Sequence, residues 1–351
     1  MVARAPLASF DTGPALRFPR QAQFHVLKYL SGLADAVERQ GGRIFCDTRA
    51  DSVDGGHPAR VATARGTITC DAVVVATNTP IVSRVIVHAR QAAYQTYVIG
   101  AEIRPGSVTR ALFWDTEDPY HYMRVHTIGR EILIVGGEDH KTGQADDADE
   151  RWARLEAWTR ARVPDIERIA YRWSGEVMEP VDRVALIGKN PNDADNVFIV
   201  TGDTGMGMTH GTIAGMLLPD LIAGREHAWA RLYDPSRVRV GAAPTFLAEA
   251  ANMAAQYGDW LTPGDVASID AVPRGSGAVI RRGVTKVAVY RDDTGVVHEC
   301  SAVCPHLGCI VDWNSAERTW DCPCHGSRFD ARGGLLNGPA NTGLERRAKA
   351  A

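Results

Sequence analysis

The sequence predicts a chain of two domains, a mixed α/β domain followed by a small all-β domain. Two observations predict the first domain: apolar strands at 71–80 and 196–201 that run into small polar turns, and helical apolar spacing from Gln21. A third observation predicts the second domain, because short strand patterns after residue 263 surround two loops rich in Cys and His. A length of 351 residues leaves room for about two such domains.

The composition is that of an ordinary globular protein, with 45% hydrophobic and 23% charged residues. The net charge of −3 gives no argument for nucleic acid or an anionic membrane surface as a partner. No apolar run has the length of a membrane helix, and residues 1–18 hold no signal-peptide h-region. We therefore expect a cytoplasmic protein with no transmembrane segment and no nucleic-acid partner.

Strand and helix patterns follow one another along the first domain. A hairpin is expected at 50–69, around the turn at 54–56, and strand 71–80 is expected to be parallel and fully buried because its apolar run is continuous. Strand candidates between 98 and 135 predict a mainly antiparallel sheet, followed by a flexible polar loop at 136–143. We expect helices at 21–40, 149–163, 212–222 and 245–261, and strands at 43–46, 98–103, 112–114, 121–125, 132–135, 184–187, 278–280, 286–290 and 296–300.

The strongest chemical signal is a pair of loops near the end of the chain. The first loop reads CPHLGC (304–309), and the second, which starts after twelve further residues, reads CPCHGS (322–327). A Rieske [2Fe–2S] centre holds one iron by two Cys and the other by two His, so each loop must supply one thiolate and one imidazole. The predicted ligands are Cys304, His306, Cys322 and His325.

A zinc site and a disulfide framework are the two alternatives to a cluster in these loops. A zinc site can also use two Cys and two His, although zinc fingers usually pair Cys with Cys and His with His. A framework of disulfides alone fits poorly with a chain that has no secretory segment. Cys300 and His298 lie on a strand outside the loops and are expected to pack rather than to bind metal.

The two loops, CPHLGC and CPCHGSRFD, resemble the two box motifs of the Rieske family, and GGLLNGPA (333–340) resembles the proline loop that follows them. The resemblance implies the same four ligands, with a disulfide between Cys309 and Cys324. Respiratory members of that family have a Tyr where this chain has Phe329, whereas Ser327 is kept. One fewer hydrogen bond to sulfur predicts a reduction potential below the top of the Rieske range, which is roughly +300 mV.

A glycine-rich turn follows the strand at 196–201 and leads into a helix. Glycines let a backbone approach a ligand closely, and the N–H groups at the start of a helix favour an anion. A purely structural turn would have a similar sequence, so this turn alone does not decide between the two.

Several segments together resemble the D-amino-acid-oxidase-like family of FAD-dependent oxidoreductases, some members of which carry a C-terminal Rieske domain. The matching segments are FHVLKYL (24–30), GGRI (41–44), DAVVVATNTP (71–80), DTEDPYHYMRV (115–125), ILIVGGEDHKTG (132–143), WSGEVMEPVDRVALIG (173–188) and VTGDTGMGMTHGTIAG (200–215). The family begins with a G-x-G-x-x-G unit that grips the FAD pyrophosphate, and residues 1–100 contain no such motif. We therefore expect an N-terminally truncated chain with weakened FAD affinity.

The resemblance implies an α/β (α+β) partial FAD-dependent oxidoreductase fold lacking its first βαβ unit, followed by a small all-β Rieske domain. The expected domains are the flavin-type domain at 1–244, a helical linker at 245–263 and the Rieske domain at 264–351. The expected flavin contacts are Ala76, Thr77, Asn78, Gly202, Asp203, Gly205, Gly207, Met208, Thr209 and His210.

These resemblances imply an oxidoreductase with FAD and a [2Fe–2S] cluster as cofactors. It would take electrons from an amine or amino-acid substrate and exchange them, through the cluster, with a partner protein. Two alternatives stay open: an electron-transfer protein that is not an enzyme, and a zinc-stabilised interaction protein. The sequence does not identify a catalytic base.

Overall fold

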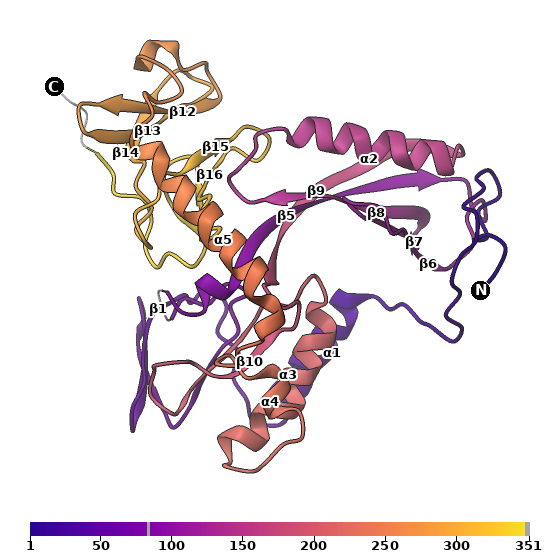
Figure 1. Cartoon of the computed structure of the whole chain (residues 1–351), viewed down its shortest axis with the longest axis horizontal. Helices are drawn as coiled ribbons and strands as arrows, with labels where there is room; N and C mark the ends of the chain where they lie inside the picture. Colours follow the sequence, from indigo (N-terminus) through magenta and orange to yellow (C-terminus); the bar gives the residue numbers. More distant parts are fainter. Residues whose placement is uncertain (83–84, 348–351) are drawn as a thin grey trace. The chain divides into compact units, whose positions relative to one another are not determined.

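The computed structural model describes residues 1–82 and 85–347 and divides into two compact units (Figure 1). Each unit has its own sheets and is described by itself. Unit 1 comprises residues 1–49, 97–139 and 149–174, and unit 2 comprises residues 50–96, 140–148 and 175–351. None of the helices in the described ranges is both long and apolar enough to cross a membrane.

Unit 1 contains two helices and most of a five-stranded sheet with the order β6-β7-β8-β5-β9. The pairs β6–β7 and β7–β8 are antiparallel, as the sequence predicts. Helix α2 packs on this sheet: the ring of Trp152 contacts that of Tyr97 edge-on, and its indole N–H donates to the carbonyl of Trp173. The elements are α1 (Val26–Arg39), β5 (Gln91–Ile103), β6 (Leu112–Trp114), β7 (His121–Ile128), β8 (Arg130–Lys141), α2 (Ala148–Arg162) and β9 (Ile166–Pro180), of which β5, β8 and β9 continue into unit 2.

Two small sheets and two covering helices form the first part of unit 2. The strands β1, β2 and β3 make an antiparallel sheet. Strand β11 lies between β10, to which it is antiparallel, and β4, to which it is parallel. Helix α3 packs on β10 and β11 through Leu217 and Leu218. The elements are β1 (Ala50–Asp54), β2 (Ala59–Thr63), β3 (Gly66–Cys70), β4 (Val73–Val75), η1 (His88–Arg90), β10 (Leu186–Lys189), β11 (Val197–Thr201), α3 (Gly207–Ile222) and α4 (Ala230–Tyr233).

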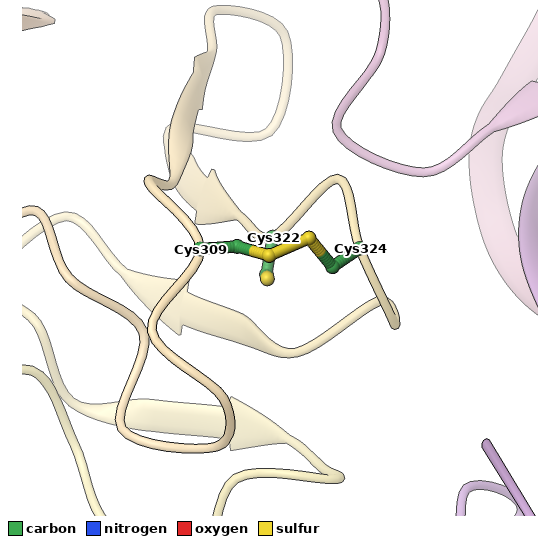
Figure 2. Close-up of side chains that lie close together, drawn as sticks. All are labelled: Cys309, Cys322 and Cys324. Carbon is green, nitrogen blue, oxygen red and sulfur yellow. A yellow bond between two sulfur atoms is a disulfide. The ribbon is translucent and has the colours of Figure 1, made fainter. Parts of the chain in front are cut away.

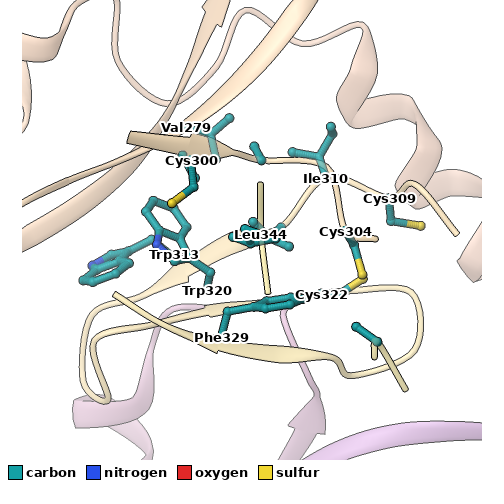
Figure 3. Close-up of a cluster of buried hydrophobic side chains, with 14 of the residues drawn as sticks. Val279, Cys300, Cys304, Cys309, Ile310, Trp313, Trp320, Cys322, Phe329 and Leu344 are labelled. Carbon is teal, nitrogen blue, oxygen red and sulfur yellow. The ribbon is translucent and has the colours of Figure 1, made fainter. Parts of the chain in front are cut away.

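The second part of unit 2 is a small all-β region preceded by a helix. Strands β12–β14 form one antiparallel sheet and β15–β18 form another. Trp313, Trp320 and Phe329 fill a core that also contains the Cys of both loops (Figure 3). The elements are η2 (Val240–Ala242), α5 (Ala243–Gln256), η3 (Tyr257–Trp260), η4 (Ile269–Ala271), β12 (Ser276–Arg282), β13 (Thr285–Arg291), β14 (Val297–Ser301), β15 (Asp312–Asn314), β16 (Thr319–Asp321), β17 (Arg328–Asp330) and β18 (Leu335–Asn337).

Three sequence-based predictions of local structure are wrong. Residues 43–46 form no strand, and the side chains of Ile44 and Phe45 are exposed. Most of the predicted loop at 136–143 belongs to the end of β8. Glycine is required at position 136 because a Cβ there would collide with the ring of Tyr122. Strand β4 is parallel as predicted but not fully buried, since Val74 is 41% exposed. The reason is that β4 is the outer strand of its sheet.

Several boundaries also differ from the prediction: the helix expected at 21–40 begins at Val26, and the helix expected at 245–261 is α5, which ends at Gln256. The hairpin expected at 50–69 is a meander of three strands, because the chain turns a second time between Thr63 and Gly66. Helix α3 begins at Gly207 rather than at Thr212, so that the last part of the glycine-rich turn is the first helical turn.

Candidate functional site

The two Cys- and His-rich loops close in the same way. In the first loop the amide of Gly308 donates to the carbonyl of Cys304, and in the second the amide of Gly326 donates to the carbonyl of Cys322, both at 3.0 Å. Both glycines have a φ of 81°, a conformation that residues with a Cβ rarely adopt. The sequence spacing Cys-x-x-x-Gly therefore builds two equivalent turns, each of which presents a Cys and a His.

The four predicted ligands are brought together as two pairs. Figure 3 shows Cys304 and Cys322 pointing toward each other, and their thiols are hydrogen-bonded. The rings of His306 and His325 lie 4.9 Å apart between centroids, nearly perpendicular to each other. All four side chains are buried, with exposed fractions between 1% and 8%. Pairing thiol with thiol and imidazole with imidazole is what a Rieske centre requires.

The remaining two Cys of the loops form the disulfide that the family resemblance implies. Cys309 and Cys324 are bonded across the loops, with a Cα–Cα distance of 6.4 Å (Figure 2). The sulfur of Cys322 lies within 4.8 Å of both disulfide sulfurs. Because disulfide sulfurs are not thiolates, Cys304 and Cys322 are the two thiols that the loops can offer to iron.

Protonation of the loop residues suits metal binding. The hydrogen bond between the thiols lowers the pKa of Cys304 and raises the pKa of Cys322. Burial, with a smaller effect of His306, lowers the pKa of His325 to about 3, so this ring is neutral at pH 7. The Nδ1 atom of His325 is buried without a hydrogen-bond partner. A neutral imidazole with an unpartnered nitrogen, beside two thiols, fits the donor set of a [2Fe–2S] cluster.

The short helix η3, which directly follows α5, holds the first loop through two hydrogen bonds. The hydroxyl of Tyr257 donates to the carbonyl of Leu307 at 2.8 Å, and the indole N–H of Trp260 donates to the carbonyl of Gly308 at 2.9 Å. In the second loop Ser327 is fully buried and donates to the sulfur of Cys304. These bonds fix the loop backbone and one ligand sulfur.

Two buried residues next to the loops were not predicted from the sequence. His88 contacts both candidate ligand rings, at centroid distances of 4.9 Å to His306 and 5.8 Å to His325. Glu176 accepts hydrogen bonds from Thr79 at 3.2 Å and from Asn337 at 2.6 Å. His88 lies in no motif of the sequence, and the segment 173–188 that contains Glu176 resembles the flavin family without indicating a role near the loops. Each residue reaches the loops from a distant part of the chain.

Burial determines the charge of Glu176. It raises the pKa of this carboxyl to about 8, and the nearby Arg328 opposes the shift only in part. Glu176 is therefore largely protonated at pH 7. Its second oxygen, Oε2, has no hydrogen-bond partner.

The ten predicted flavin contacts lie together just after the ends of strands β4 and β11, on a surface that we call the open edge. Strands β4 and β11 are parallel, so the segments that follow them, 76–78 and 202–210, lie at the same end. The hydroxyl of Thr201 donates to the carbonyl of Asn78 and joins the two segments. Asp203 organises the turn: its carboxylate accepts from the amide of Gly205 and its carbonyl from Nδ1 of His210, at 3.2 and 3.0 Å.

The open edge, formed by residues 76–78 and 202–210, is largely accessible to solvent. Most of its residues are exposed, including Ala76, Asn78, Gly207 and Thr209. Gly202 is an exception that has a structural reason, because a Cβ there would lie 2.5 Å from the ring of Pro180. The first turn of α3 provides backbone N–H groups at the end of a long helix, a setting that favours a negatively charged or polar group.

The arrangement is that of a redox protein in which a flavin-type fold precedes an iron–sulfur domain. Residues 1–221 match the family described as FAD dependent oxidoreductase, and residues 262–347 match the Rieske [2Fe-2S] domain. The chain belongs to the FAD-dependent oxidoreductase family and carries a Rieske domain at its C-terminal end. The match to a Rieske domain, rather than to a zinc domain, agrees with the way each loop mixes Cys and His.

Known proteins resemble the whole chain and its parts. A putative Rieske 2Fe-2S iron-sulfur protein, YhfW of Bacillus subtilis, is 30% identical over 93% of this chain, and the chain spans 64% of the length of that relative. The cytochrome b6-f complex iron-sulfur subunit 1 of Nostoc is 57% identical over 17% of this chain and 34% of its own. The crystal structure of glycine oxidase from Geobacillus kaustophilus has a TM-score of 0.51 at 18% identity, covering 60% of this chain and 57% of that one, which shows a shared fold.

Proposed function

We propose that this chain takes electrons from an amine or amino-acid substrate at a flavin site and exchanges them with a partner protein through a Rieske cluster. The observation that carries the proposal is the buried set of two thiols and two imidazoles in the same compact unit as the strand ends at 76–78 and 202–210. The amino-acid class of substrate is supported by the shared fold with glycine oxidase.

In this proposal Cys304 and Cys322 hold one iron, and His306 and His325 hold the other. Bound FAD would accept two electrons from a substrate, and a [2Fe–2S] cluster would carry them singly. The protein contributes position and exclusion of water: the disulfide and the hydrogen bonds of Tyr257 and Trp260 fix the loops. The candidate flavin contacts would act through the backbone of residues 76–78 and the first turn of α3.

Domain boundaries at 244 and 263 are part of the same proposal. They are supported by the Rieske match from residue 262 and by helix α5, which occupies 243–256. A cytoplasmic location stays a prediction from the sequence.

The first experiment is anaerobic purification followed by a visible spectrum and by quantification of iron, sulfide, zinc and flavin in one sample. We expect two iron and two sulfide per chain, with FAD retained or bound on addition. Glycine and a panel of primary and secondary amines would then be added to the loaded protein, and reduction of the cluster would be monitored by EPR. Zinc without sulfide would contradict the cluster, and a loaded protein that no amine reduces would contradict the substrate class.

A second candidate function is an electron-transfer protein without its own substrate. The specific observation that favours it is the contrast in burial, since the cluster ligands are buried whereas most candidate flavin contacts are exposed. Iron and sulfide at two per chain, with no FAD bound even at high FAD concentration, would support this candidate over the first.

A further inference from the structure

The residue that carries a further inference is His88, in the short helix η1. Its side chain is 3% exposed and its ring contacts both candidate ligand rings. The contact with His306 is the closer of the two, with 4.9 Å between the ring centroids and an angle of 77° between the ring planes. His88 lies more than 200 residues before the loops in the sequence and belongs to the same compact unit.

The hydrogen bonding of His88 fixes its tautomer. One ring nitrogen bonds to the backbone of Pro80, and because proline has no N–H, that partner is the carbonyl and His88 is the donor. The Nδ1 atom is buried without a partner, so the donor is Nε2–H and Nδ1 carries a lone pair.

A histidine that binds a metal through one ring nitrogen needs a hydrogen-bond acceptor for the N–H of the other, and His88 can provide one. One ring nitrogen binds iron and the other carries a proton, which in buried metal sites is almost always donated to an acceptor. Both His306 and His325 are buried, so an uncoordinated N–H there has little access to water. With 4.9 Å between the ring centroids and 77° between the ring planes, the edges of the two imidazoles can face each other, which brings a ring N–H of one within reach of the in-plane lone pair on a nitrogen of the other.

We propose that His88 is a positioning residue that accepts, at Nδ1, a hydrogen bond from the iron-free ring N–H of His306. This inference rests on the ligand assignment proposed above. The bond orients the ligand ring and makes it a stronger electron donor to iron, which favours the oxidised cluster. Removing the acceptor therefore raises the midpoint potential.

Three substitutions separate the acceptor from the bulk of the ring. His88→Asn places an amide oxygen near the position of Nδ1 and keeps the acceptor, whereas His88→Gln places an amide N–H near Nε2 and keeps only the bond to Pro80. His88→Leu keeps neither group. His298→Gln, at a partly buried histidine that pairs with Asp292 away from the loops, is the matched control.

The measurement is the one-electron midpoint potential of the complete, cluster-loaded chain, together with its EPR g-values. We expect His88→Gln and His88→Leu to make the cluster about tenfold easier to reduce, an upward shift of about 59 mV, while His88→Asn and His298→Gln stay near wild type. Equal shifts in the Asn and Gln variants would overturn the proposal, as would no shift in any variant or loss of the cluster from all three. A wild-type chain without two iron and two sulfide would instead contradict the ligand assignment.

Discussion

The cluster loops and the glycine-rich turn of the same compact unit make opposite use of burial. In the loops every candidate ligand is at most 8% exposed, and the hydrogen bonds from η3 and Ser327, together with the disulfide, hold the loops in place. In the turn most candidate contacts are exposed, and the hydrogen bonds of Asp203 to Gly205 and His210 run within the turn itself. The loops are preorganised for a small, fully enclosed group, whereas the turn offers one open edge to a larger ligand.

This contrast explains which interactions should be most sensitive to substitution. A buried ligand set has no water to replace a lost side chain, so each member is needed. An exposed edge can exchange a lost contact for water, so single changes there should have small effects. Four predictions test this contrast, and each one is matched to a control in the chain.

The largest effect is expected for Cys322→Ser. A serine hydroxyl is a poor ligand for iron in place of a thiolate, and the substitution should abolish the cluster. Cys300→Ser is the control, because Cys300 is also buried in this domain but donates to the carbonyl of Arg332. Iron, sulfide and the visible spectrum would be measured in both variants. Loss of iron from Cys300→Ser and retention in Cys322→Ser would contradict the ligand assignment.

The next largest effect is expected for Glu176→Gln. Burial raises the pKa of Glu176 to about 8 in the folded chain. In the unfolded chain the same carboxyl loses its proton near the ordinary pKa of a glutamate, so between these two pKa values only the folded chain keeps the proton. The stability contributed by this group is therefore present at low pH and is lost as pH rises toward 8. Each tenfold change in proton affinity is worth about 1.4 kcal/mol, so the loss is on the order of a few kcal/mol.

Urea unfolding between pH 5 and pH 8.5 would measure this loss. Wild type should lose stability across the window, and Glu176→Gln should lose less, because an amide does not ionise. Glu226→Gln, at an exposed position of the same unit, should follow wild type. Parallel pH profiles for wild type and Glu176→Gln would show that the carboxyl is not held protonated.

The two regions also differ in how much of them could be predicted from the sequence. The loops are short, and the ligand pairs lie within six residues, so that spacing alone predicted Cys304, His306, Cys322 and His325. The neighbours that complete the site, His88 and Glu176, come from more than 100 residues earlier, and only the fold brings them near. No local pattern encodes such a contact.

The errors in the fold prediction have the same origin. Strand β8 was predicted to end in a polar loop because it contains Gly136 and Gly137, yet Gly136 is required by the ring of Tyr122 on the neighbouring strand. Val74 was expected to be buried because its neighbours are apolar, yet β4 is an edge strand. In both cases a cross-strand neighbour, which the local sequence does not contain, decides the outcome.

A smaller effect is expected for Ser327→Ala. Ser327 is buried, accepts from the amide of Ala340 at 3.0 Å and donates to the sulfur of Cys304. A hydrogen bond to sulfur stabilises the more negative, reduced cluster, so its removal should lower the midpoint potential. A bond worth about 1 kcal/mol corresponds to about 40 mV for one electron. Redox titration with EPR would measure the shift, and Ser315→Ala, in a turn of the same domain, is the control. A potential at or above that of wild type would contradict this role.

The smallest effect is expected on the open edge, for Thr209→Glu. Thr209 is exposed in the first turn of α3, where a carboxylate interacts favourably with the helix N-terminus and does not destabilise the fold. The same carboxylate would compete with a polar or anionic part of FAD for that helix end and should weaken binding by about 0.5–1 kcal/mol, a few-fold in dissociation constant. Met216→Glu, exposed farther along α3, should leave the affinity unchanged. Titration of FAD fluorescence against each variant measures the difference. Equal affinities for both variants and wild type would mean that FAD does not use the start of α3, and would leave the cluster as the better supported of the two redox sites.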